Sequence, residues 1–237
     1  MGMPVAVTVR DPAAEPADLD PVFAWLRDVD ARFSPYRRSS EISRLDRGEL
    51  ALADAHPDVR DVLARCEALR AGTRGAFDAR ATGRLDPCGL VKGWAVDRAA
   101  ERLRAGSFCI DAGGDVLVRG GPWRVGVRHP RRRDRLAAVL ELDRGAVATS
   151  AAYERGGHVL DPRTGRPPRG VLSVTVTAAD LATADAWATA AFAMGESGPA
   201  WTAGLRGAGA MTVLADGRVL STPAFDVLSG TGVAWAA

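Results

Sequence analysis

The stretch DPCGLVKGWAVDRAAERLRAGSFCIDAGGD, residues 86–115, decides how the rest of the chain is arranged. It begins with a turn around Gly89 and continues through Lys92 into a predicted helix, which Gly106 is expected to end. The apolar residues of this helix recur at the spacing of one face: Val96, Ala99, Ala100 and Leu103. Residues 107–111 are predicted to form a short strand, which runs into the turn at Gly113 and Gly114.

Both turns of this stretch have properties of an anion site. A loop that enters a helix leaves backbone N–H groups unpaired at the positive end of the helix dipole. Two consecutive glycines let a backbone segment approach a ligand closely, because no Cβ intervenes. We therefore predict a phosphate-binding site between the turn at Gly89 and the turn at Gly113 and Gly114, with a purely structural role as the alternative for either turn.

Helices are predicted before this stretch, and mostly strands after it. The N-terminal part predicts a strand at 3–9, a helix that begins at Asp18 or Asp20 and ends at Phe33, and helices at 40–45 and 56–71. The later part predicts strands at 115–119, 123–128, 136–142, 146–149, 157–160, 171–177, 210–215 and 218–222, and helices at 183–194 and 197–205. This order indicates an α+β fold with mostly antiparallel sheets and flanking helices, in one domain over residues 1–237.

Composition excludes several classes of protein. The chain has 31 basic and 29 acidic residues, so its net charge does not indicate binding to nucleic acid or to a membrane surface. Its three cysteines, Cys66, Cys88 and Cys109, are far apart, which argues against a disulfide framework or a zinc site and fits a reducing compartment. The N-terminus lacks the features of a signal peptide, and no run reaches the ~18 apolar residues of a membrane span. The sequence as given predicts a cytoplasmic protein.

Asp185 and Thr189 are four residues apart on the predicted helix after strand 171–177, so both oxygens can face one point. A carboxylate and a hydroxyl suit Mg²⁺, which binds few protein ligands and keeps phosphate oxygens and waters. The alternative is a solvated aspartate beside a threonine that bonds to its own helix.

His158 precedes a turn that begins at Asp161 and ends at Gly165. A histidine there can orient a phosphate or move a proton, and it can equally cap the turn. The G-x-S-x-G motif of serine hydrolases is absent. The glycine pair opens a strand, whereas the dinucleotide-binding fingerprint requires a helix at this point.

Taken in chain order, nine short motifs make the sequence resemble the FAD:protein FMN transferases, the ApbE family. They are MG at the start, FSPYRRSSEISRL, GAFD, DPCGLVKGWAVDRA, DAGGD, ATSAAYER, HVLDPRTGRP, SVTVTA and ATADAWATA. The resemblance extends from Met1 to about Leu214. It implies an ApbE-like fold of two lobes, with Mg²⁺ and FAD bound between them.

The resemblance also implies an activity and a set of site residues. In this family FMN is moved from FAD onto a threonine or serine hydroxyl of an acceptor flavoprotein, and AMP leaves. The implied metal ligands are Asp185, Thr189 and the main-chain carbonyl of Gly89, and the implied catalytic residues are His158 and Asp185. The implied FAD contacts are Met1, Tyr36, Ala76, Phe77, Asp78, Asp86, Lys92 and Leu160. Tyr36 and Phe77 offer rings to a flat ligand, and Lys92 offers a point charge to the diphosphate.

This chain departs from the family pattern at several places. Some relatives carry a second carboxylate one residue before the metal-binding threonine, where this chain has Ala188. Relatives usually carry Asn where this chain has Asp46, and they have a longer segment where only Arg80 to Leu85 joins two motifs. Asp46 is either a charge near the flavin phosphates or the exposed end of a short helix. The first reading favours a rival activity, an FAD pyrophosphatase in which water replaces the acceptor hydroxyl. A flavin-binding protein without turnover is the second rival.

The resemblance leaves other properties of the protein open. Many relatives are exported lipoproteins, and because Met1 is itself a motif residue, the natural start can lie upstream of it. Association with a membrane would come through the acceptor.

Overall fold

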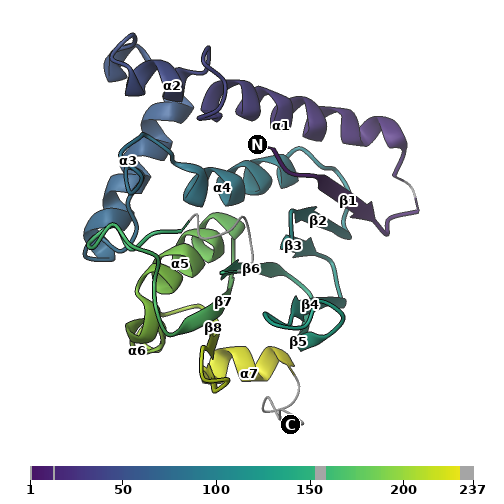
Figure 1. Cartoon of the computed structure of the whole chain (residues 1–237). Helices are drawn as coiled ribbons and strands as arrows, with labels where there is room; N and C mark the ends of the chain where they lie inside the picture. Colours follow the sequence, from purple (N-terminus) through teal and green to yellow (C-terminus); the bar gives the residue numbers. More distant parts are fainter. Residues whose placement is uncertain (1, 13, 153–158, 230–237) are drawn as a thin grey trace.

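The computed structural model describes residues 2–12, 14–152 and 159–229 (Figure 1). Its helices are α1 (Asp20–Phe33), α2 (Glu41–Asp46), α3 (Pro57–Gly72), α4 (Cys88–Ala100), α5 (Leu181–Ala193), α6 (Gly198–Thr202) and α7 (Pro223–Ser229), with 3-10 turns η1 (Pro16–Leu19), η2 (Leu52–Asp54) and η3 (Gly195–Ser197). Its strands are β1 (Val5–Val9), β2 (Phe108–Ala112), β3 (Asp115–Arg119), β4 (Trp123–Arg128), β5 (Leu136–Leu142), β6 (Gly145–Ala151), β7 (Val171–Ala178), β8 (Gly209–Leu214) and β9 (Val219–Ser221).

In the described part of the chain, seven strands form one antiparallel sheet in the order β1-β2-β3-β6-β7-β8-β9. The β-branched strand β7 lies inside this sheet, between β6 and β8, with Val174 and Val176 fully buried. Strands β4 and β5 pair only with each other and form a separate ribbon.

One face of the sheet is covered by helices. Helix α5 packs on β6 and β7, and α4 lies between α5 and α1 (Figure 1). Trp94 of α4 is 2% exposed, and its ring centroid lies 5.3 Å from that of Phe33 and 5.4 Å from that of Trp25 on α1. The helix that carries Lys92 is therefore held on both sides by packed helices.

The other face of the sheet supports the β4–β5 ribbon and α7. Their contact is a second apolar cluster made of Val118, Trp123, Val125, Val127, Leu140, Leu142, Val147, Met211, Val213 and Phe225. Since this cluster involves neither α4 nor α5, it stabilises the sheet without contributing to the predicted site.

The α+β class and most of the predicted elements are confirmed. Strands β3, β4 and β5 have the predicted bounds. The first helix begins at Asp20, but η1 precedes it and Asp18 bonds to the backbone N–H of Glu15. The predicted helix at 40–45 is α2, with Ser40 as its N-cap. The strand predicted at 157–160 is wrong for residues 159 and 160, which belong to no strand, and its first two residues lie outside the described residues.

Two helix predictions need correction, and one helix was missed. Helix α4 ends at Ala100, because the N–H groups of Arg102 and Leu103 bond three residues back and tighten the chain into a turn. The helix predicted at 197–205 is divided into η3 and the shorter α6. Helix α7 was not predicted. No helix in the described residues is long and apolar enough to span a membrane.

Candidate active site

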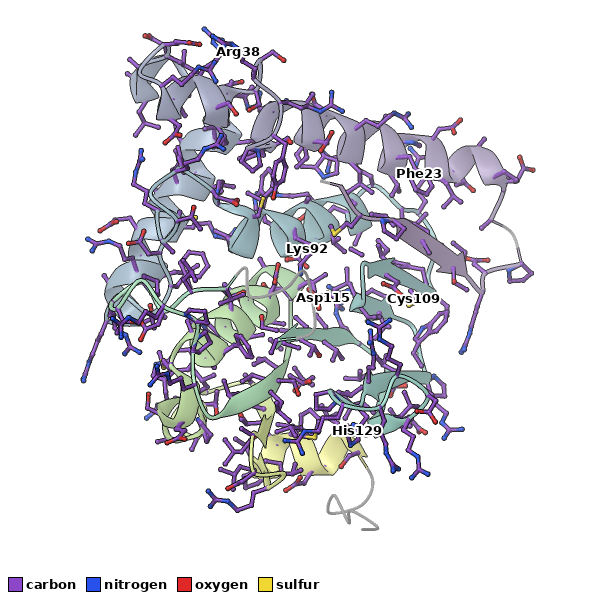
Figure 2. All side chains as sticks on the ribbon, in the orientation of Figure 1. Phe23, Arg38, Lys92, Cys109, Asp115 and His129 are labelled. Atoms are coloured by element: carbon purple, nitrogen blue, oxygen red, sulfur yellow. The ribbon has the colours of Figure 1, made fainter. Side chains whose placement is uncertain are left out.

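The predicted lysine and the predicted metal-binding aspartate meet at the centre of the molecule. Lys92 projects from α4, and its ammonium contacts the carboxylate of Asp115 at the start of β3 (Figure 2). The same ammonium lies 3.2 Å from Oδ1 of Asp185 on α5. Each carboxylate also accepts a backbone hydrogen bond, Asp115 from Thr149 at 2.9 Å and Asp185 from Gly93 at 3.3 Å. We call Lys92, Asp115 and Asp185 the charged cluster.

Burial dominates the electrostatics of this cluster. It raises the pKa of Asp185 to about 7, although the nearby charge of Lys92 acts in the opposite direction. The pKa of Asp115 is raised for the same reason. Burial alone would lower the pKa of Lys92, but the two carboxylates stabilise the ammonium and raise it instead. Lys92 is therefore a charge shared by two carboxylates, and its expected contact with the diphosphate stays a prediction.

The other expected metal ligands lie beside the charged cluster. Thr189 is one turn beyond Asp185 on α5, and its hydroxyl lies 3.4 Å from that of Ser150. Gly89 on α4 faces it, since a Cβ at Gly89 would lie 3.6 Å from the threonine Oγ1. Within the described residues, no three His, Cys, Asp or Glu side chains come together as metal ligands. One carboxylate, one hydroxyl and one carbonyl are nonetheless hard-oxygen donors that fit Mg²⁺.

Helices α4 and α5 approach each other unusually closely at this point. A Cβ at Gly93 would lie 2.3 Å from the carbonyl oxygen of Leu181, so only glycine fits there. One turn later, the carboxylate of Asp97 accepts hydrogen bonds of 2.8 Å from the N–H groups of both Leu181 and Ala182. These contacts fix the start of α5 against α4 and thereby fix the relative positions of Lys92 and Asp185.

The expected FAD contacts lie mainly around the second part of the connection between α3 and α4, residues 78–86, which we call the link. Asp78 and Asp86 are half-buried at its two ends, and Arg84 reaches the carbonyl of Pro35 at 3.2 Å, next to Tyr36. The link is open to solvent on the side where Tyr36 lies, because this residue is 79% exposed. The link also borders a groove of about 590 Å³, whose lining includes Leu45, Leu63, Cys66, Asp78 and Leu85.

The remaining expected contacts are less accessible or outside the described residues. Ala76 and Phe77 are 1% and 3% exposed, and the Phe77 ring lies against Gly89, so its stacking on a ligand stays a prediction. Leu160 is half-buried in an irregular segment before the Asp161 turn. Met1 and His158 lie outside the described residues, so their implied roles also stay predictions.

The two predicted phosphate turns already have acidic partners of their own. Asp86 accepts a 3.0 Å hydrogen bond from the N–H of Cys88 at the start of α4. Asp111 likewise accepts a 2.8 Å bond from the N–H of Gly114 in the β2–β3 turn. Because these N–H groups are occupied and a carboxylate stands beside each, the phosphate site predicted from these two turns is not supported.

Asp46 is not the exposed helix end that one interpretation predicted. Its side chain is 18% exposed and accepts a 2.8 Å hydrogen bond from the N–H of Leu85. It also pairs with Arg80 at 3.2 Å and lies 3.9 Å from Arg84. The carboxylate thus binds the link, and its charge is matched by arginines of that link.

Two important acidic residues were missed by the sequence analysis. Asp115 received no role, although it is the first residue of a strand and directly follows two glycines, a position that could have indicated a site residue. Asp97 lies four residues after Gly93, which places both on one helix face. Only the structure shows what that face contacts.

Comparisons with known proteins identify the family and the fold. A profile of the ApbE family matches residues 1–83 and 79–212, and the two matched parts overlap within the link. The FAD:protein FMN transferase of Rhodobacter capsulatus is 37% identical over 155 residues; the match covers 59% of this chain but only 30% of that protein. The solved ApbE protein of Thermotoga maritima is 25% identical, covers 96% of both chains and has a TM-score of 0.84. The Pseudomonas stutzeri flavinyl transferase ApbE is 26% identical, covers 98% of both chains and has a TM-score of 0.79. The chain belongs to the ApbE family.

Proposed function

We propose that this chain transfers FMN from FAD to a threonine or serine hydroxyl of an acceptor flavoprotein, with Mg²⁺ as cofactor and AMP as the second product. The observation that carries the proposal is the meeting of Gly89 and Lys92 on α4 with Asp185 and Thr189 on α5. The name of the Rhodobacter capsulatus relative, FAD:protein FMN transferase, supports the same activity.

The reaction exchanges one phosphorus–oxygen bond for another. The acceptor hydroxyl oxygen attacks the phosphorus of the FMN half, the bond to the bridging oxygen breaks, and AMP leaves with that oxygen. The hydroxyl proton must pass to a base, and His158 is the candidate that the family resemblance supplies. A bound Mg²⁺ would supply positive charge to the diphosphate oxygens.

The described residues have separate tasks in this proposal. Asp185, Thr189 and the Gly89 carbonyl would hold the metal, and Lys92 keeps the Asp185 carboxylate in place. The exposed ring of Tyr36 is available to stack on a flat part of FAD. Asp78 and Asp86 can accept hydrogen bonds from adenine or ribose groups near the link.

The FAD pyrophosphatase alternative rested on an unpaired charge at Asp46. Since Arg80 and Arg84 accompany that carboxylate, no described contact favours hydrolysis over transfer. The presence of Asp185, Thr189 and Lys92 together argues against the flavin-binding alternative.

Incubation with FAD and Mg²⁺, with and without an acceptor flavoprotein domain, tests the proposal. AMP together with covalently flavinylated acceptor is the expected result. AMP with free FMN would show hydrolysis, and no AMP would show simple binding. Asp185→Ala should abolish AMP formation, whereas Asp61→Ala on the exposed face of α3 is the matched control and should retain it.

A further inference from the structure

Asp115 is buried in the charged cluster and has no role in the activity proposed above. It is 3% exposed, and its carboxylate contacts the Lys92 ammonium. The family resemblance assigns it neither to the metal nor to FAD. Burying a carboxylate costs free energy unless the group is paired, so its presence in the core points to a specific function.

The position of Asp115 is fixed by the sheet. Its Oδ1 accepts the 2.9 Å hydrogen bond from Thr149 on β6, the strand that pairs with β3. The next residue on β6 is Ser150, whose hydroxyl lies 3.4 Å from that of Thr189. The same pair of strands therefore supports the charged cluster and the hydroxyl side of the expected metal site.

The formal charges explain what Asp115 can contribute. When all three groups are ionised, Lys92 carries one positive charge and Asp115 and Asp185 carry one negative charge each, so the cluster retains one net negative charge. If Asp115 were neutral, Lys92 would compensate Asp185 alone, and the cluster would have no net charge. A carboxylate that is fully compensated by its own lysine attracts a divalent cation less strongly.

We propose that Asp115 is a positioning residue that shares the charge of Lys92 and so leaves Asp185 able to bind a divalent cation. The inference rests on the proposed function, because it assumes that Asp185 is a metal ligand. It adds a residue that touches neither the metal nor FAD but sets the affinity for the metal through Lys92.

Direct measurement of cation binding tests this inference without turnover. Mn²⁺ binding is followed by electron paramagnetic resonance in mildly alkaline buffer, with and without FAD. Asp115→Asn keeps the acceptor oxygen for the Thr149 N–H and removes the charge, and Mn²⁺ affinity should fall roughly tenfold. The double variant Asp115→Asn/Lys92→Gln restores the net negative charge of the cluster, so affinity should return toward the wild-type value.

The matched control is Asp111→Asn. Asp111 lies on the same hairpin but is exposed, so its loss should leave Mn²⁺ affinity nearly unchanged. An unchanged affinity in Asp115→Asn would overturn the inference while leaving the metal site intact. A loss that the double variant does not reverse, or an equal loss in the control, would also overturn it. If the wild type binds no Mn²⁺ with or without FAD, the proposed metal site fails together with this inference.

Discussion

Gly93→Ala is the substitution that most directly tests how the two site helices are held together. The added Cβ would lie 2.3 Å from the Leu181 carbonyl oxygen and 2.6 Å from the Ala182 nitrogen. These are backbone atoms, so no side-chain rotation relieves the overlap. Ordinary contact requires about 3.4 Å, and α4 and α5 must therefore separate by about 1 Å.

The cost of this separation can be estimated from its parts. Overpacking of this kind costs about 1–3 kcal/mol. The two hydrogen bonds from Asp97 to the start of α5 are charge-assisted, and weakening them adds about 1–2 kcal/mol. The better helix propensity of alanine offsets about 1 kcal/mol. We expect a net loss of about 1–4 kcal/mol in the free energy of unfolding.

Urea unfolding and FMN transfer measure the two consequences separately. A displacement of about 1 Å between Lys92 and Asp185 should lower turnover by roughly a hundredfold even where the variant is folded. Gly72→Ala, at the end of α3, is the control, because no atom lies within 4 Å of its added Cβ. If Gly93→Ala unfolds within about 0.5 kcal/mol of the wild type and retains its turnover, the argument from close approach is wrong.

Three further predictions concern individual charges. The folded state holds the Asp185 proton more tightly than the unfolded chain does, because burial raises the pKa of this carboxyl from 3.8 to about 7. Without divalent cation, the wild type should therefore lose stability relative to Asp185→Asn as the pH rises through this range, by up to about 4 kcal/mol. Urea unfolding at stepped pH checks this, and a stability difference that stays constant with pH would contradict it. Lys92→Met leaves Asp115 and Asp185 buried without a counter-charge, so thermal or urea unfolding should show a loss of about 3 kcal/mol or more, and wild-type stability would refute the pairing. Asp46→Asn keeps the acceptor for the Leu85 N–H and loses only its ion pairs with the exposed Arg80 and Arg84, so the free energy of unfolding should change by less than about 1 kcal/mol. The ratio of free FMN to flavinylated acceptor should stay constant, and a clear shift in that ratio would revive the pyrophosphatase hypothesis.

Local patterns in the sequence were sufficient for most of the fold. Alternation and glycine turns located β3, β4 and β5. The predicted apolar face of α4 was correct for Val96 and Ala99, but it missed the burial of Trp94 and Ala95, because this helix is covered on more than one side. Leu103 was part of that face and is buried, but the backbone around it has already changed to a turn. Periodicity reports which side of the chain is buried, and it does not distinguish a last helical turn from a tighter one.

The candidate site was predicted less completely, for a physical reason. Asp185 and Thr189 could be paired because they share one helix, and spacing along a helix determines which side chains are neighbours. The contact of Lys92 with Asp115 and Asp185 joins two helices and a strand, so no local spacing contains it. Similarly, both predicted phosphate turns were plausible until the structure showed which carboxylates occupy their N–H groups.

Asp46 and the segment from Arg80 to Leu85 are two places where the family resemblance implied a departure, and in this structure they touch each other. Because the Asp46 carboxylate accepts the Leu85 N–H and is paired with Arg80, we expect the two departures to depend on each other. Within the family, an aspartate at this position should accompany a short, basic link, and an asparagine should accompany a longer one. A chimera that exchanges only one of the two halves should fold less well than a chimera that exchanges both.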